Sequence, residues 1–204
     1  MSPRRYDQRL RAEAAEDTRR RILDALYERL RARPSEPVSV EEIAHDARVA
    51  RSTVYLTFGS RAGLFDALAA ELFKSGEFAL VEAASANPDG RESLRDGILG
   101  GSRMFAAHRD VFRVLYSTAQ LDANAVGGAV QRLDAGRSDG MARLAGRLAA
   151  QDLLRPDITV EYAAHVLWLL TSFDGFDVLF TGRGLSLDEV VDLLTTMAER
   201  SLYR

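Results

Sequence analysis

Apolar residues along this chain recur every three or four positions, and no convincing stretch alternates with a period of two. Such spacing places the apolar side chains on one face of an α-helix. The predicted helices cover residues 18–32, 50–57, 61–84, 109–120, 126–150 and 159–181, together with three that begin after Ser39, Asp89 and Ser186. The sequence therefore predicts an all-α protein of about nine helices.

Three of the predicted helices begin with a sequence pattern that is typical of a helix N-terminus. Ser39, Asp89 and Ser186 are each followed three residues later by a glutamate, which is the pattern of a capping box. The helix over 159–181 is apolar on nearly every side. A helix without a polar face needs burial against more than one neighbour.

Two of the predicted helices are short and lie on either side of a tight turn at Arg48-Val49, which is typical of a helix-turn-helix. In the second helix, Val54 and Phe58 are four residues apart and are expected to face the core. The residues left available to DNA are Arg51, Ser52, Thr53, Tyr55 and Thr57. A recognition helix presents such side chains to base edges in the major groove.

The composition narrows the class of protein. Hydrophobic residues make up 47% and charged residues 28%, which is typical of a globular chain, and the absence of cysteine excludes disulfides and thiolate metal sites. No apolar run approaches the roughly 18 residues of a membrane span, and the N-terminus lacks a signal-like apolar stretch. We therefore expect a cytoplasmic protein without a membrane partner.

The charge is distributed unevenly. Residues 1–61 carry 13 arginines against 10 acidic residues, whereas residues 62–204 carry 14 basic residues against 20 acidic ones. A basic N-terminal segment followed by an acidic remainder is typical of a DNA-binding domain attached to a larger acidic domain. Ordinary scatter explains a difference of this size equally well.

The segment EEIAHDARVARSTVYLTFGSRAGLFDAL resembles the signature of TetR-family regulators, and TRRRILDALYERL before it looks like the family's first helix. The motif covers residues 18–65. The resemblance implies a DNA-binding domain over residues 1–60 and an effector-binding and dimerisation domain over residues 61–204. It also implies a ligand-responsive regulator that binds a palindromic operator as a homodimer and is released by a small molecule. Members of the family usually repress transcription, and activation stays open as an alternative.

The resemblance assigns roles to matching positions. Ser39 would start a helix whose backbone N–H groups point at a phosphate. Thr53, Tyr55 and Arg61 match positions that hold DNA phosphates, whereas Arg51, Ser52 and Thr57 match positions that approach bases. Arginine can bond guanine bidentately, so Arg51 is the expected specificity residue. The alternatives are that Arg51 is a solvated surface residue and that Tyr55 only packs against its helix.

Two positions depart from the family pattern. Arg48 stands where the family usually has glycine, and a left-handed conformation there would cost about 1 kcal/mol relative to glycine. Ala50 stands where a capping serine or threonine is common, and alanine cannot cap. Both put the start of the reading helix in doubt.

The resemblance also implies functions for residues 61–204. Its last two helices would form a four-helix bundle with the partner, and the expected interface residues are Phe176, Phe180, Val190, Leu194 and Met197. The expected lining of the effector pocket is Phe105, Phe112, Tyr116, Met141, Trp168, Phe173 and Asp174. Any one of these aromatic residues could instead be plain core.

Asp174 and Asp177 share one face of the mostly apolar helix. They could recognise a cationic or hydroxylated ligand, because a buried carboxylate needs a partner. The favoured alternatives are an ion pair with an arginine of helix 126–150 and simple exposure near the helix end.

Catalytic motifs are missing from the sequence. It contains no HExxH, GxSxG or GxxxxGK, and it has only three histidines. We therefore expect no enzymatic activity, no cofactor and no metal, although an unsupported enzyme function stays open. A further alternative is a helical interaction protein that kept the fold and lost sequence-specific DNA binding.

Overall fold

The computed structural model describes residues 3–121, 126 and 128–204, with side chains from Gln8 onward. Within that part of the chain there are eleven α-helices, one short π-helix and no β-strand. The prediction of an all-α fold is confirmed, and the expected count of about nine helices is slightly low. The chain divides into two compact units, residues 1–71 with 113–130 and residues 72–112 with 131–204.

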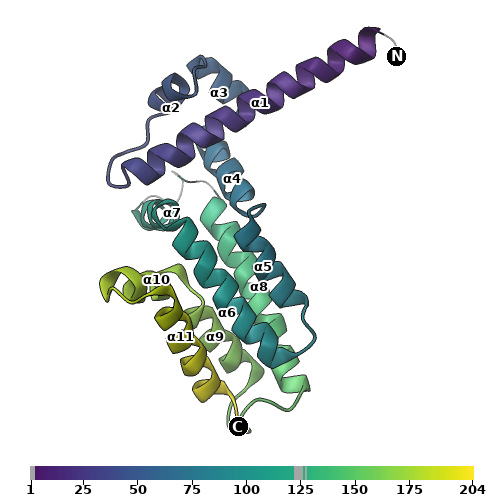
Figure 1. Ribbon diagram of the computed structural model, residues 1–204, viewed down its shortest axis with the longest axis vertical. Helices are drawn as coiled ribbons and strands as arrows, with labels where there is room; N and C mark the ends of the chain where they lie inside the picture. The colour runs from purple at the N-terminus through teal and green to yellow at the C-terminus, as the bar shows by residue number, and fades with distance from the viewer. Residues whose placement is uncertain (1–2, 122–125, 127) are drawn as a thin grey trace. The chain divides into compact units, whose positions relative to one another are not determined.

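The first unit contains the helix-turn-helix. Its helices are α1 (Pro3–Ala32), α2 (Val40–Asp46), α3 (Arg51–Phe58), α4 (Arg61–Leu72) and most of α7 (Arg109–Leu121). Figure 1 shows α2 and α3 beside α1, whose N-terminal turns extend past both. Ile22, Leu26, Ile43, Val54 and Phe65 are buried, so α1 to α4 share one small core.

The first helix begins at Pro3, well before the expected start at residue 18. Residues 8–17 are exposed on every side, so packing does not hold this segment. It contains good helix formers such as alanine, arginine and glutamate, and Arg9 pairs with Glu13 at 3.2 Å across one turn. Local propensity therefore extends α1 beyond the core that anchors it.

The second unit is a bundle of longer helices. It contains α5 (Gly76–Ala86), α6 (Gly90–Ala107), most of α8 (Ala129–Ala150), α9 (Val160–Leu170), α10 (Phe173–Asp177), the π-helix η1 (Val178–Gly182) and α11 (Leu187–Leu202). Within it α6 packs against both α5 and α11, and α11 also packs against α9 (Figure 1). Arg147 of α8 donates to Ser93 Oγ at 3.1 Å and so ties α8 to the start of α6.

Two helices that the sequence predicts as continuous are broken, which accounts for the low count. Residues 61–84 form α4 and α5, because the hydroxyl of Ser75 accepts a bond from the Phe78 N–H and starts a new helix. Residues 159–181 form α9, α10 and η1. Here Ser172 accepts from the Gly175 N–H at 3.1 Å and caps α10. Serine is a common N-cap, so both breaks had a local signal.

Of the three predicted capping boxes, one is complete. Ser186 and Glu189 bond each other's backbone N–H groups at the start of α11. Ser39 and Asp89 also cap their helices, but the glutamate of each box bonds a different partner. Glu42 pairs with Arg29, and Glu92 accepts from the side chain of Asn87. The predicted helix starts are therefore correct, although two of the glutamates serve other contacts.

Within the described residues, no single helix is long and apolar enough to cross a membrane. Val160–Leu170 and Phe173–Gly182 reach that length and composition only as a pair, and the break between them bends the pair by 48°. The functional division at residue 60 stays a prediction. As a packing unit, the first part of the chain runs on through most of α4.

Candidate functional site

The outward face of α3 is the first candidate site. Val54 is buried and Phe58 is half-buried, as the four-residue spacing predicts. Arg51, Ser52 and Tyr55 are exposed on the other side of the helix. The structure therefore gathers three of the predicted DNA contacts on one accessible surface.

Thr57 lies differently from the other predicted contacts. Its hydroxyl donates a 2.8 Å hydrogen bond to the Thr53 carbonyl one turn earlier, and both threonines are half-buried. Threonine often bonds back to the helix in this way. The outward position next to it belongs to Leu56, whose exposed fraction is 91%. Sequence reasoning missed Leu56 because it selected polar residues as DNA contacts.

Arg51 and Tyr55 are neighbours across one turn. The Arg51 guanidinium carbon lies 5.6 Å from the centre of the Tyr55 ring. A hydrogen bond with the Tyr55 side chain raises the pKa of Arg51. An arginine guanidinium is charged throughout the physiological pH range in any case. Both side chains are exposed, so the pair presents a cation beside an aromatic ring.

The turn before α3 has the conformation that the sequence placed in doubt. Arg48 has φ of 55°, in the left-handed region that glycine adopts at no steric cost. The Val49 N–H bonds the Ala44 carbonyl at 2.9 Å and closes the turn. Ala50 takes the N-cap position of α3 with an extended backbone, and its methyl side chain cannot cap. The reading helix therefore begins at Arg51 despite both departures.

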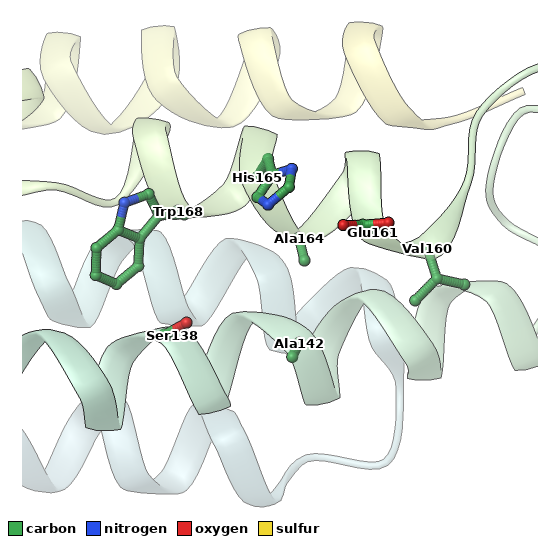
Figure 2. A pocket seen from close by; sticks show the side chains of 7 residues that line it. All are labelled: Ser138, Ala142, Val160, Glu161, Ala164, His165 and Trp168. Carbon is green, nitrogen blue, oxygen red and sulfur yellow. The ribbon is translucent and has the colours of Figure 1, made fainter.

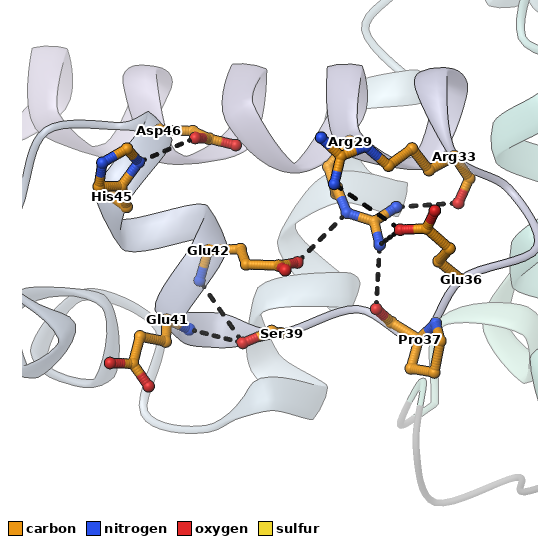
Figure 3. A network of polar contacts seen from close by, with 9 residues as sticks. All are labelled: Arg29, Arg33, Glu36, Pro37, Ser39, Glu41, Glu42, His45 and Asp46. Carbon is orange, nitrogen blue, oxygen red and sulfur yellow. Dashed lines mark hydrogen bonds and ion pairs between the residues drawn. The ribbon is translucent and has the colours of Figure 1, made fainter.

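Ser39 starts α2 with its side chain. Its Oγ accepts from the N–H groups of Glu41 and Glu42 at 3.2 and 3.5 Å (Figure 3). Two of the free N–H groups at this helix start are thus satisfied inside the protein. The other backbone N–H groups of the first turn of α2, together with the partial positive charge of this helix end, can interact with a phosphate placed at the N-terminus of the helix.

A buried arginine fixes the loop that leads to α2 (Figure 3). The Arg29 side chain is only 4% exposed. Its guanidinium donates to the carbonyls of Arg33 at 2.8 Å and Pro37 at 3.1 Å, and it pairs with Glu36 at 3.2 Å and Glu42 at 3.4 Å. One side chain therefore joins the end of α1, the 33–39 loop and α2.

Sequence reasoning also missed Arg29, since an arginine is usually a surface residue. The available signal was its register. Arg29 lies three residues after Leu26 and directly before Leu30, both of which are buried on the inner face of α1. A charged residue on an apolar face is buried only with partners.

Arg61 stands at the start of α4. It is half-buried, and its guanidinium carbon lies 5.4 Å from the centre of the Phe65 ring in the core of the first unit. Stacking on the ring restricts the guanidinium and limits where it can point. Arg61 is thus a fixed cation close in sequence to α3.

Three of the residues predicted to line a pocket meet in the second unit. The ring of Phe105 lies 5.1 Å from that of Phe112 and 5.5 Å from that of Phe173. Phe176, predicted for the dimer interface, lies 5.7 Å from Phe105 in the same cluster. All four rings are buried, so here they pack against one another as core.

The other predicted pocket residues lie apart from this cluster. Met141 and Trp168 are half-buried in the second unit, and Asp174 is exposed on α10. Tyr116 is half-buried in the first unit, on the part of α7 that belongs there. The predicted lining is therefore divided between several places.

Trp168 borders a groove between α8 and α9 (Figure 2). The groove has a volume of about 690 Å³, which is within the usual range for small-molecule sites. It is lined by Ser138, Ala142, Val160, Glu161, Ala164, His165 and Trp168. The guanidinium carbon of Arg137 lies 3.3 Å from the centre of the Trp168 ring and so holds the indole in place.

The two aspartates near the end of the apolar helix have separate surroundings. Asp177 pairs with Arg109 at 3.0 Å and accepts a 2.7 Å bond from Thr181. The alternative of an ion pair is thus met by Arg109 at the start of α7, and a pair with an arginine of helix 126–150 stays a prediction. Asp174 is exposed, as the other alternative held.

The predicted interface residues divide between core and surface. Phe176, Val190 and Leu194 are buried inside the protomer, Phe180 is half-buried, and Met197 is exposed. Besides Met197, the large apolar side chains exposed on α9, η1 and α11 include Tyr162, Leu169, Val178 and Leu193. Tyr162 and Leu169 are seven residues apart, and Leu193 and Met197 four, so each pair shares one helix face.

Comparison with known proteins gives a consistent result. The family model for bacterial regulatory proteins of the tetR family matches residues 22–68. NalD, the secondary repressor of the MexAB-OprM multidrug efflux pump in Pseudomonas aeruginosa, is 26% identical with a TM-score of 0.70. That match covers 94% of this chain and 98% of NalD. Among curated proteins none matches the chain.

Two further solved structures share the fold. A TetR-like transcriptional regulator from Rhodococcus sp. RHA1 is 26% identical, with 90% of this chain and 94% of that one covered and a TM-score of 0.64. AibR, solved with isovaleryl coenzyme A and operator DNA, is 18% identical, with 88% and 97% covered and a TM-score of 0.66. The signature on α2 and α3 agrees with the match of residues 22–68 to the tetR family model, and over most of its length the chain is similar to solved TetR-family regulators.

Proposed function

We propose that this protein is a ligand-responsive repressor that binds a palindromic operator as a homodimer. The observation that carries the proposal is the outward face of α3, where Arg51, Ser52 and Tyr55 are exposed on a helix anchored by Val54. Such a protein acts on chromosomal DNA, so its place is the cytoplasm. The functional division at residue 60 belongs to the same proposal.

In vitro selection of DNA sites tests this function. We expect enrichment of a palindrome whose half-sites are about one helical turn apart, because two recognition helices must enter the same side of the duplex. No enrichment would favour the alternative, a helical interaction protein that has lost sequence-specific binding. Activation instead of repression would appear as raised transcription from a promoter that carries the selected site.

The contacts divide by chemistry. Arg51 and Ser52 are proposed to meet base edges, and Thr57 lies at the margin of that surface because its hydroxyl bonds Thr53. The proposed phosphate contacts, which fix the register on DNA, are Ser39, Thr53, Tyr55 and Arg61. Phosphate contacts contribute affinity for every sequence, whereas base contacts discriminate between sequences.

Arg61→Ala is expected to weaken binding to operator and random DNA alike. Each phosphate contact releases about one counterion, so the slope of log affinity against log salt should fall by about one for each bound subunit. Affinity titrations over a series of salt concentrations measure this slope. An unchanged slope would contradict the phosphate assignment.

The exposed apolar residues of α9, η1 and α11 support a dimer through these helices. Leu169 is 67% exposed and shares its helix face with Tyr162. An apolar surface of this kind is a common mark of a protein interface. Because Phe176, Val190 and Leu194 are already buried in the protomer, Met197 with this exposed set is the better candidate for the contact.

The wild-type chain is expected to be a dimer at micromolar concentration without DNA. Leu169→Glu should shift it toward monomer, since a carboxylate would be buried in the interface without a partner. Light scattering measures the mass, and Leu80→Glu on α5, also at an exposed leucine, is the matched control. A monomeric wild type, or equal effects of the two variants, would argue against this interface.

A small-molecule effector is proposed to bind the second unit. The groove beside Trp168 has room for a ligand, whereas Phe105, Phe112 and Phe173 pack together as core in the same unit. An effector releases DNA only if it binds the DNA-incompetent state more tightly than the competent one. Screening compounds for a shift in melting temperature, with release from operator as the second readout, tests this part.

A further inference from the structure

The most exposed large apolar side chain that the structure describes lies on the reading helix. Leu56 is 91% exposed, with Tyr55 on one side and the inward-turned Thr57 on the other. It lies four residues after Ser52, so the two share the row of α3 that points away from Val54. Leu56 is therefore at the centre of the outward face.

The major groove offers few partners to a leucine. Its base edges carry hydrogen-bond donors and acceptors, which a leucine side chain cannot use, and one apolar group, the 5-methyl of thymine. The polar groups of Arg51 and Ser52, on the same face of α3, are suited to the donors and acceptors. We propose that Leu56 is a specificity residue that selects thymine through contact with its methyl group. This inference rests on the proposed function of α3.

The threonine beside it is a poorer candidate for this contact. The Thr57 hydroxyl is bonded to the Thr53 carbonyl, and the side chain is half-buried. Leu56 has no comparable role in the core, because its side chain is almost fully in solvent. Its replacement should leave the fold intact and change only what the surface contacts.

Replacing thymidine by deoxyuridine tests the contact, because it removes the methyl group and nothing else. Each thymine of the selected operator is replaced in turn, at the same position of both half-sites. At one position the wild type should lose about fourfold in affinity per half-site, or about 16-fold in all, which corresponds to losing burial of one methyl-sized group per half-site. Leu56→Ala should bind the operator with thymine and the operator with deoxyuridine at that position with equal affinity.

Two variants act as controls. Leu121→Ala removes a leucine that is 89% exposed but lies on α7, and it should keep the full preference for thymine. Leu56→Gln keeps the length of the side chain and should lose the preference. Unchanged melting temperatures show that each variant is folded.

The outcomes separate the inference from the function on which it rests. If the wild type enriches no DNA site, the proposed function fails first. If it binds an operator but no deoxyuridine substitution weakens binding, or if Leu56→Ala retains the sensitivity to deoxyuridine, Leu56 does not read a methyl group. The inference would also be overturned if, relative to the wild type, Leu56→Ala lost the same affinity for the thymine operator as for the deoxyuridine operator at every position.

Discussion

Replacing Arg51 with alanine is expected to weaken operator binding by about 1–3 kcal/mol in each half-site and to relax the preference at one base pair. Arg51 is exposed in the first turn of α3, where a recognition helix reaches base edges. Its guanidinium stays charged beside Tyr55 and can donate two parallel bonds to one guanine. Competition titrations with the operator, single-base variants of it and random DNA measure the effect.

A lysine variant sharpens this test. Arg51→Lys keeps the charge but loses the planar donor pair, so we expect affinity for random DNA to survive while base preference falls. Losses of Arg51→Ala that are equal on operator and random DNA would mean that Arg51 only contacts phosphates. In that case the specificity must come from Ser52 and its neighbours.

Arg29→Ala is expected to lower the free energy of unfolding by about 2 kcal/mol, mainly because two carbonyls lose a buried donor. Arg29 bonds the carbonyls of Arg33 and Pro37 from a side chain that is almost fully buried. Its carboxylate partners, Glu36 and Glu42, are about half exposed, so the ion pairs themselves add little. Denaturant titration of the full chain measures the change.

The same substitution should weaken DNA binding, because the loop held by Arg29 leads directly to Ser39 and α2. Arg31→Ala is the matched control, since Arg31 is exposed and pairs only with Glu28 at 3.3 Å among the residues described. We expect its unfolding free energy to stay within about 0.5 kcal/mol of the wild type. If Arg29→Ala were as stable as Arg31→Ala, the network would have no structural role.

The local pattern of the sequence predicted much of the structure of α2 and α3. The four-residue spacing of Val54 and Phe58 gave the inward face, and Ser39 gave the start of α2. The sequence also marked Arg48 as a position that departs from the family pattern, and its φ of 55° lies in the left-handed region. These features depend on residues within one or two turns, which is why a sequence can specify them.

The errors come from contacts between residues far apart in sequence. Arg29 looked like a surface residue until the 33–39 loop supplied its partners, and Asp177 pairs with Arg109, 68 residues away. The omission of Leu56 from the outward residues of α3 has a local cause instead, because only polar residues were considered as DNA contacts. The division of 159–181 also has a local cause, since a cap at Ser172 competes with a continuous helix.

The sequence by itself determined the all-α class, the starts of most helices and the presence of a helix-turn-helix. Only the tertiary structure decided which apolar face of α10 and α11 is core. It placed Phe176, Val190 and Leu194 inside the protomer and left Leu193 and Met197 exposed. Periodicity tells which side chains share a face of a helix, whereas burial depends on which neighbour covers that face, and distant parts of the chain supply that neighbour.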